Sequence, residues 1–119
     1  MSDAHYQQIL AEQLAMNRQT WAVLQQHGVT EQSELRLDFH LSATNKQEAE
    51  GFVAWIQEQT DYDVRAVSSG SFLRRRWGVE GTTQKTMVSL QFLNEWVTWM
   101  VESGKAYSCD FGGWGAMLS

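Results

Sequence analysis

Hydrophobic residues recur along the chain with two periods, one of about 3.6 residues and one of two, and the changes between them predict helices and strands. In the first stretch, Ala4 to Gln26, the apolar residues fall within about half of a helical wheel, and Gly28 ends the pattern. We therefore predict an amphipathic N-terminal helix. Its apolar residues are Tyr6, Ile9, Leu10, Leu14, Met16, Trp21, Val23 and Leu24.

A strict alternation of polar and apolar residues follows from Glu34 to Leu41, and it predicts a strand with one buried face. Thr44 and Gln47 then have the spacing of a capping box, which predicts the start of a second helix that ends near Gln59. The side chains expected in the core are Leu35, Leu37, Phe39 and Leu41 from the strand and Ala49, Phe52, Val53 and Ile56 from the helix.

The second half of the chain combines short alternating stretches with one long apolar stretch. Alternation over five to ten residues indicates strands, and clustered serine and glycine indicate a turn between two of them. The predicted elements are a strand at residues 62–66, a turn at 68–71, a strand at 72–80, a helix at 83–103 that Gly104 ends, and a strand from Ala106.

The order of the predicted elements is helix, then strand, helix, strand, strand, helix, strand. After the leading helix, this is the order of the split β-α-β, ferredoxin-like arrangement. We therefore predict an α+β fold: a four-stranded antiparallel sheet, both later helices on one face, and an extra N-terminal helix. The chain has 119 residues and no proline or repeat, so we expect one domain over residues 1–119. Residues 1–28 would hold the extra helix and residues 33–119 the ferredoxin-like part.

The predicted third helix is too apolar for contact with a sheet alone. A second apolar stripe runs along it through Val88, Phe92, Trp96 and Trp99, so that the apolar arc spans roughly 220°. Either the N-terminal helix or a partner molecule is expected to cover this stripe. Because buried tryptophans dominate interface energetics, Trp96, Trp99 and Trp55 are candidate anchors for a partner or for a homodimer.

Charge and composition limit the classes of function. The net charge of −5 repels polyanions, so indiscriminate nucleic-acid binding is disfavoured. The N-terminus lacks the pattern of a secretory signal, and polar residues interrupt the apolar stretch from Met87 to Val101. We therefore expect no membrane span and a place in the cytoplasm.

The side chains that could carry chemistry are scattered along the sequence. Metal binding needs clustered ligands, but the three histidines fall on different predicted elements and Cys109 is the one cysteine, so no metal or cofactor site is predicted. A dyad of Cys109 and His40 is opposed by their phase, which points them to opposite faces of the sheet. Cys109 is instead expected to be a buried structural thiol. No pair of carboxylates has neighbours that predict desolvation, so no catalytic residue is predicted.

A run of three arginines, residues 74–76, holds a third of the cations and falls in the predicted third strand. In a ferredoxin-like sheet Arg36 and Arg65 would be its neighbours on the open face, which predicts a local basic patch. RNA-binding sheets of this topology also stack bases on aromatic side chains of the open face. Phe72 is the one candidate for such a position, so direct RNA binding is disfavoured.

The chain ends in CDFGGWGAMLS, in which three glycines surround Trp114. A phosphate-binding loop requires a helix after its glycines, but only four residues follow Gly115. A β-bulge or kink explains the glycines better. We expect it to bend the last strand and to reverse the facing of Trp114 relative to Phe111.

The stretches FHLSA at 39–43, WGV at 77–79 and FGGWG at 111–115, taken in order, resemble the family of regulator of ribonuclease activity B, the ribonuclease E inhibitor proteins of proteobacteria. The terminal signature of that family is an aromatic residue, Asp, Gly, Trp, Gly and a small residue. Gly112 stands where the family has its aspartate, and we expect function to diverge most at this position. The best-known members also continue into a long acidic tail, whereas this chain stops at Ser119.

The resemblance implies a non-enzymatic, ferredoxin-like protein that binds an endoribonuclease and modulates RNA decay through protein contact. One alternative is a divergent interaction module with another partner, or a homodimer that forms through the aromatic edge of the third helix. Another is an enzyme with a pocket near two tryptophans, Trp77 and Trp114. The residues expected to contact a partner are Arg74, Arg76, Trp77, Trp96, Trp99, Gly112, Gly113, Trp114 and Gly115.

Overall fold

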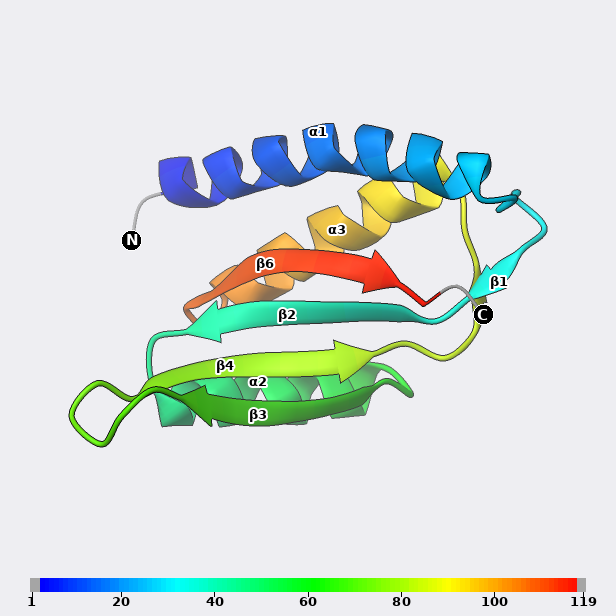
Figure 1. Cartoon of the computed structure of the whole chain (residues 1–119). Helices are drawn as coiled ribbons and strands as arrows, with labels where there is room; N and C mark the ends of the chain where they lie inside the picture. Colours follow the sequence, from blue (N-terminus) through cyan, green and yellow to red (C-terminus); the bar gives the residue numbers. More distant parts are fainter. Residues whose placement is uncertain (1–2, 118–119) are drawn as a thin grey trace.

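A four-stranded antiparallel sheet and three helices make up the computed structural model, which describes residues 3–117 (Figure 1). The sheet has the strand order β3-β4-β2-β6, and β1 and β5 form a separate two-stranded sheet. The predicted α+β class is therefore confirmed. The elements are α1 (Asp3–Gln26), β1 (Glu34–Leu35), β2 (Leu37–Ala43), α2 (Lys46–Gln59), β3 (Asp63–Ser69), β4 (Arg76–Thr82), β5 (Thr86–Met87), α3 (Leu90–Lys105) and β6 (Cys109–Ala116).

The three helices cover different parts of the sheet (Figure 1). α2 packs against β3 and β4, and α3 packs against β6. α1 packs on α3 and also contacts β6, beside which it runs. An uncovered edge strand exposes N–H and C=O groups that can pair with another chain, and a covering helix prevents this. α1 therefore shields the β6 side of the sheet, while β3 forms the opposite edge.

The alternation at residues 34–41 is confirmed as a burial pattern but not as one strand. All four side chains on the predicted inner face are at most 8% exposed. The strand breaks at Arg36, because β1 pairs with β5 whereas β2 pairs with β4 and β6. Thr83 holds the chain just after the break: its Oγ1 accepts a hydrogen bond from the Leu37 N–H at 3.1 Å, and its own N–H donates to the Leu37 carbonyl at 2.8 Å.

The second helix has its predicted end at Gln59, but its cap differs from the prediction. Asn45 is the N-cap residue, and its side-chain oxygen accepts a hydrogen bond from the Glu48 N–H at 2.9 Å. The hydroxyl of Thr44 donates instead to the carbonyl of Ser108 at 3.0 Å. Asparagine and threonine can both cap a helix, and here the contact with Ser108 leaves Asn45 to do so.

The third helix begins seven residues later than predicted. Thr83 is bound to β2, the chain is then extended through β5, and Ser89 caps α3 by accepting a hydrogen bond from the Phe92 N–H at 3.0 Å. Gly104 was predicted to end the helix, but it lies buried within the last turn. A Cβ atom there would lie 2.8 Å from the carbonyl oxygen of Cys109, so the glycine allows close packing on β6. No helix within residues 3–117 combines the length and apolar content that crossing a bilayer requires.

The third predicted strand also begins later than expected. β4 starts at Arg76, and residues 70–75 form a loop between β3 and β4. Gly70 turns the chain with a φ of +91°, and the Arg74 N–H donates to the Ser71 carbonyl at 3.0 Å. Because this turn interrupts the alternation, the predicted strand residues Phe72 and Leu73 lie outside the sheet.

The face that α1 buries differs from the predicted apolar face at several positions. Met16 and Val23 are 52% and 49% exposed, whereas the polar side chains of Gln13 and Asn17 are buried. α1 packs on α3 and β6 through a line of residues that contains these two amides beside Tyr6, Trp21 and Leu24. Hydrophobicity alone therefore predicts the helix but not the exact face that it buries.

Candidate protein-binding surfaces

The nine residues predicted to contact a partner do not form one site. Two of the nine lie side by side: the ring of the partly buried Trp114 makes an edge-to-face contact with the buried ring of Trp96 at 6.4 Å. The others are spread along the molecule: Arg74 and Arg76 at the β3–β4 loop, Trp77 in β4 under Lys46, Trp99 beside Trp55 of α2, and Gly112, Gly113 and Gly115 along β6.

A bulge at Gly112 and Gly113 determines the direction of Trp114. The register between β2 and β6 shifts there, so that Gly112 has no partner of its own on β2. Gly113 has a φ of +144°, which favours glycine. The predicted bulge is confirmed, but its effect on facing is the opposite of the prediction. It returns Trp114 to the face of Phe111, and both rings contact Trp96.

Gly112 lies against the side chain of His40 on the other face of the sheet. A Cβ atom at Gly112 would lie 2.6 Å from both Cδ2 and Nε2 of the imidazole. An aspartate at this position would therefore require the His40 ring to turn away. Gly112, where the chain departs from the expected signature, is thus fitted to the present position of His40.

A chain of hydrogen bonds connects the terminal signature to both neighbouring helices. Trp114 Nε1 donates to Asn17 Oδ1 at 2.7 Å, and Asn17 Nδ2 donates to Asn94 Oδ1 at 3.1 Å. Asn17 is fully buried. We missed this residue in the sequence, although its spacing of four residues from both Gln13 and Trp21 places it on their helix face. The signature tryptophan therefore joins β6 to α1 and α3 through its indole N–H.

The apolar stripe predicted on the third helix is only partly covered. Trp96 is buried and its Nε1 donates to the Tyr62 hydroxyl at 3.2 Å, whereas Phe92 and Trp99 are half-buried. α1 packs on the Asn94 flank of α3, about 160° around the helix from Phe92. The N-terminal helix thus does not cover the exposed part of the stripe.

The exposed part of this stripe borders a hollow of ≈310 Å³ next to the end of α2. On its α2 side, the ring of Trp55 lies 5.5 Å from that of Trp99. We call this hollow the aromatic groove. It is lined by Thr60, Tyr62, Phe92, Glu95, Trp96 and Trp99.

The β3–β4 loop, residues 70–75, projects beyond the end of the sheet (Figure 1). Phe72 and Leu73 at its apex are 89% and 88% exposed. Together with Arg74 and the next two arginines, these residues form what we call the hairpin tip, residues 72–76. The arginine run is therefore not within one strand, because only Arg76 belongs to β4.

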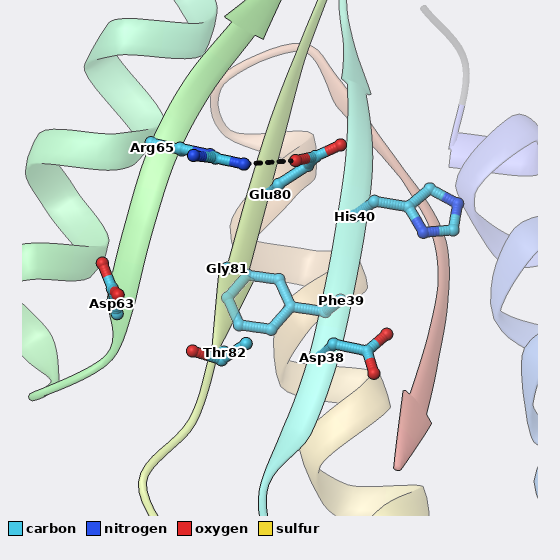
Figure 2. Close-up of a pocket in the computed structure, with 8 residues that line it drawn as sticks. All are labelled: Asp38, Phe39, His40, Asp63, Arg65, Glu80, Gly81 and Thr82. Atoms are coloured by element: carbon cyan, nitrogen blue, oxygen red, sulfur yellow. Dashed lines mark hydrogen bonds and ion pairs between the residues drawn. The ribbon is translucent and has the colours of Figure 1, made fainter. Parts of the chain in front are cut away.

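The predicted basic patch around the three arginines does not form. Arg65 is directed toward Glu80 on the neighbouring strand, and its Nη2 lies 3.4 Å from the carboxylate (Figure 2). Arg36 lies at the break between β1 and β2, at the end of the sheet opposite to the β3–β4 loop. The hairpin tip thus carries its cations apart from the other two.

The open face of the sheet has a hollow of ≈490 Å³, and half of its eight lining residues are charged (Figure 2). Three of its lining residues carry carboxylates, which repel a phosphate backbone. Neither this hollow nor the aromatic groove is lined by Trp77 or Trp114, near which the alternative of an enzyme requires a pocket. The lining residues are Asp38, Phe39, His40, Asp63, Arg65, Glu80, Gly81 and Thr82.

Cys109 is fully buried, as predicted for a structural thiol. Its Sγ donates to the Tyr107 carbonyl at 3.4 Å. Burial raises the pKa of the Cys109 thiol to about 11, with smaller contributions from the charges of Glu48 and Asp110. A thiol with this pKa stays protonated at neutral pH and is a poor nucleophile. Among residues 3–117, no three His, Cys, Asp or Glu side chains are grouped as metal ligands.

The sequence model of one known family, described as Regulator of ribonuclease activity B, matches residues 14–116. The matched range begins inside α1 and ends with β6, so it includes every strand and the hydrogen bonds that join Trp114, Asn17 and Asn94. No curated protein matches the chain.

Proposed function

Because the chain belongs to the family of Regulator of ribonuclease activity B, we propose that it binds an endoribonuclease of the ribonuclease E type and slows RNA decay in the cytoplasm. The match over residues 14–116 is the observation that carries the proposal. Regulation through protein contact requires an exposed surface rather than a catalytic centre. The aromatic groove and the hairpin tip are two such surfaces.

A non-enzymatic role is part of this proposal. The one cysteine is buried and protonated at neutral pH, so it is not suited to nucleophilic catalysis. This observation favours regulation by contact over catalysis.

We also propose that the arrangement is ferredoxin-like. The order β2, α2, β3, β4, α3, β6 along the chain, together with the strand order β3-β4-β2-β6, supports it. In this description α1 is the additional helix that shields β6, and the pair β1 and β5 is a small addition at one end.

Binding and inhibition by the purified chain test the proposed function. The chain, at micromolar concentration, is titrated into ribonuclease E, and both association and the cleavage rate of a labelled RNA are followed. We expect saturable association and a cleavage rate that falls with occupancy. Titration of the chain into the RNA alone separates binding of the enzyme from binding of its substrate. A chain that neither associates with the enzyme nor slows cleavage contradicts the proposal.

The aromatic groove supports a second candidate function, association with another copy of the chain or with a different protein. Phe92 and Trp99 are half-buried in the lining of the groove, with Trp99 beside Trp55, and tryptophan is frequent among residues that dominate interface energies. Sedimentation at increasing concentration tests self-association, with Trp99→Ala as the variant and Met16→Ala as its control. A chain that stays monomeric at all concentrations contradicts the homodimer.

A further inference from the structure

The hairpin tip exposes apolar side chains that the fold does not use. Phe72 and Leu73 are 89% and 88% exposed, whereas the other large exposed apolar residues among 3–117 reach at most 68%. Neither side chain belongs to the buried core or packs against it. Neighbouring apolar residues that remain exposed often mark a surface that another molecule covers.

The loop holds these two side chains in a defined turn. The Arg74 N–H donates to the Ser71 carbonyl at 3.0 Å, which places Phe72 and Leu73 at the two corner positions of a β-turn. Gly70 has a φ of +91°, and a Cβ atom there would lie 2.3 Å from the Arg74 carbonyl oxygen. This turn therefore requires glycine at position 70. An apex that is ordered before binding loses less conformational entropy when it binds.

The charge of the hairpin tip is opposite to that of the whole chain. Residues 74–76 are three exposed arginines, while the chain has a net charge of −5. The ion pairs within residues 3–117 are His5 with Asp110, Arg65 with Glu80, and Lys105 with Asp3, and none of them involves the tip. The three guanidinium groups are thus available to carboxylates of another molecule.

We propose that the hairpin tip is the surface that contacts the endoribonuclease, an inference that rests on the proposed function, and that it docks on an acidic patch around an apolar pocket. Phe72 and Leu73 would fill the pocket, and the arginines would face the carboxylates at its rim. Aromatic and arginine side chains are enriched among the residues that contribute most to protein interfaces.

A protein surface suits the tip better than a polyanion does. RNA or an anionic bilayer presents negative charge over a wide area, so the acidic body of the chain would be repelled when the tip docks. The open face of β3 and β4 also carries Asp63 and Glu80, farther from the tip, and these carboxylates would repel a polyanion wide enough to cover that face. Leu73 also offers no ring on which a base can stack. A discrete acidic patch on a protein meets the arginines without these costs.

The test compares variants of the tip with matched variants elsewhere, using the full chain and ribonuclease E. Phe72→Gln/Leu73→Gln removes the apolar apex, and Met16→Gln/Val23→Gln changes two exposed apolar residues of α1 as its control. We expect the tip variant to bind about tenfold or more weakly and the control to bind like the unchanged chain.

A second pair of variants tests the charges. Arg74→Ser/Arg75→Ser removes two cations at the tip, and Arg18→Ser/Lys85→Ser removes two exposed cations elsewhere. We expect the tip pair to weaken binding at low salt and to lessen its dependence on salt, because fewer charges then face the acidic patch. The control pair should change neither the affinity at low salt nor the dependence of binding on salt.

The outcomes separate this inference from the proposed function. If the unchanged chain binds ribonuclease E and the tip variants bind equally well, the inference is wrong and the proposed function stands. If the unchanged chain does not bind, the proposed function fails, and the inference fails with it. An RNA oligonucleotide and phosphatidylglycerol vesicles serve as further probes. Binding of either probe that depends on the tip, while ribonuclease E binding does not, also overturns the inference.

Discussion

The end of β6 and the hairpin tip both carry aromatic residues within short distinctive stretches, but the fold uses them in opposite ways. Trp114 contacts Trp96 and donates to Asn17 in the core, whereas Phe72 is 89% exposed and has no part in the core. The terminal signature is thus explained by packing. A strong family signature therefore need not be a binding site, and the exposed tip is the better candidate for a contact with a partner.

Removing the signature tryptophan tests this contrast most strongly. Trp114→Ala leaves a cavity beside Trp96 and leaves the side-chain oxygen of Asn17 without its donor. We therefore expect the free energy of unfolding to fall by about 3 kcal/mol or more. Urea unfolding measures this change. Phe72→Ala, which removes an exposed ring, should change the same quantity by no more than about 0.5 kcal/mol. Equal losses from the two variants would remove the distinction between the two regions.

The buried thiol of Cys109 gives the stability of the β6 region a dependence on pH. Its pKa is about 11 in the folded chain, against an ordinary value of 9.0. Above pH 9 the unfolded chain loses this proton first, so stability is complete below pH 9 and falls as the pH rises toward 11. We expect a loss of about 2 kcal/mol over this range. Urea unfolding from pH 8 to 11 measures it, and Cys109→Ala should lessen the decline. An unchanged decline in that variant contradicts the assignment.

The buried amide of Asn17 tests the polar part of the same region. Asn17→Ala leaves Trp114 Nε1 without its acceptor and Asn94 without its donor, so we expect a loss of about 1.5 kcal/mol in the free energy of unfolding. Gln8→Ala, at an exposed position of the same helix, controls for helix propensity. If the two variants lower the free energy of unfolding equally, the hydrogen bonds of Asn17 to Trp114 and Asn94 do not stabilise the fold.

Much of the fold could be predicted from residue alternation, because a strand with one buried face must alternate. The inner face of residues 35–41 and the end of α2 at Gln59 follow from the pattern. The start of α3 could not be predicted in this way. Residues 83–89 have helix-compatible composition, but pairing with β1 and the hydrogen bonds of Thr83 to Leu37 keep them extended.

The candidate site was harder to predict because its features depend on tertiary contacts. The glycines of β6 predicted a bulge, but only the register with β2 shows that Trp114 returns to the face that packs on the core. Asn17 looks like a surface residue until Trp114 and Asn94 are placed beside it. Phe72 and Leu73 fit the alternation of a strand, and the turn that Gly70 permits removes them from it.

The departure from the family signature can be tested by restoring the aspartate. Gly112→Asp places a Cβ atom against the His40 ring, which must turn away, and we expect a cost of about 1 kcal/mol. In a His40→Ala chain the same change should cost almost nothing, because the obstructing ring is absent. Urea unfolding of the two single variants and the double variant gives the coupling. Additive costs would show that Gly112 and His40 are not fitted to each other.

The smallest change in stability is expected at the hairpin tip. Phe72→Gln/Leu73→Gln leaves the backbone hydrogen bond of the turn and the glycine at 70 unchanged, so the free energy of unfolding should stay within about 0.5 kcal/mol of the unchanged chain. Thermal and urea unfolding measure it, with Met16→Gln/Val23→Gln as the matched pair. A large loss would mean that these side chains support the fold. A small loss means that the two exposed apolar residues lower solubility without stabilising the fold, as expected for residues of a binding surface.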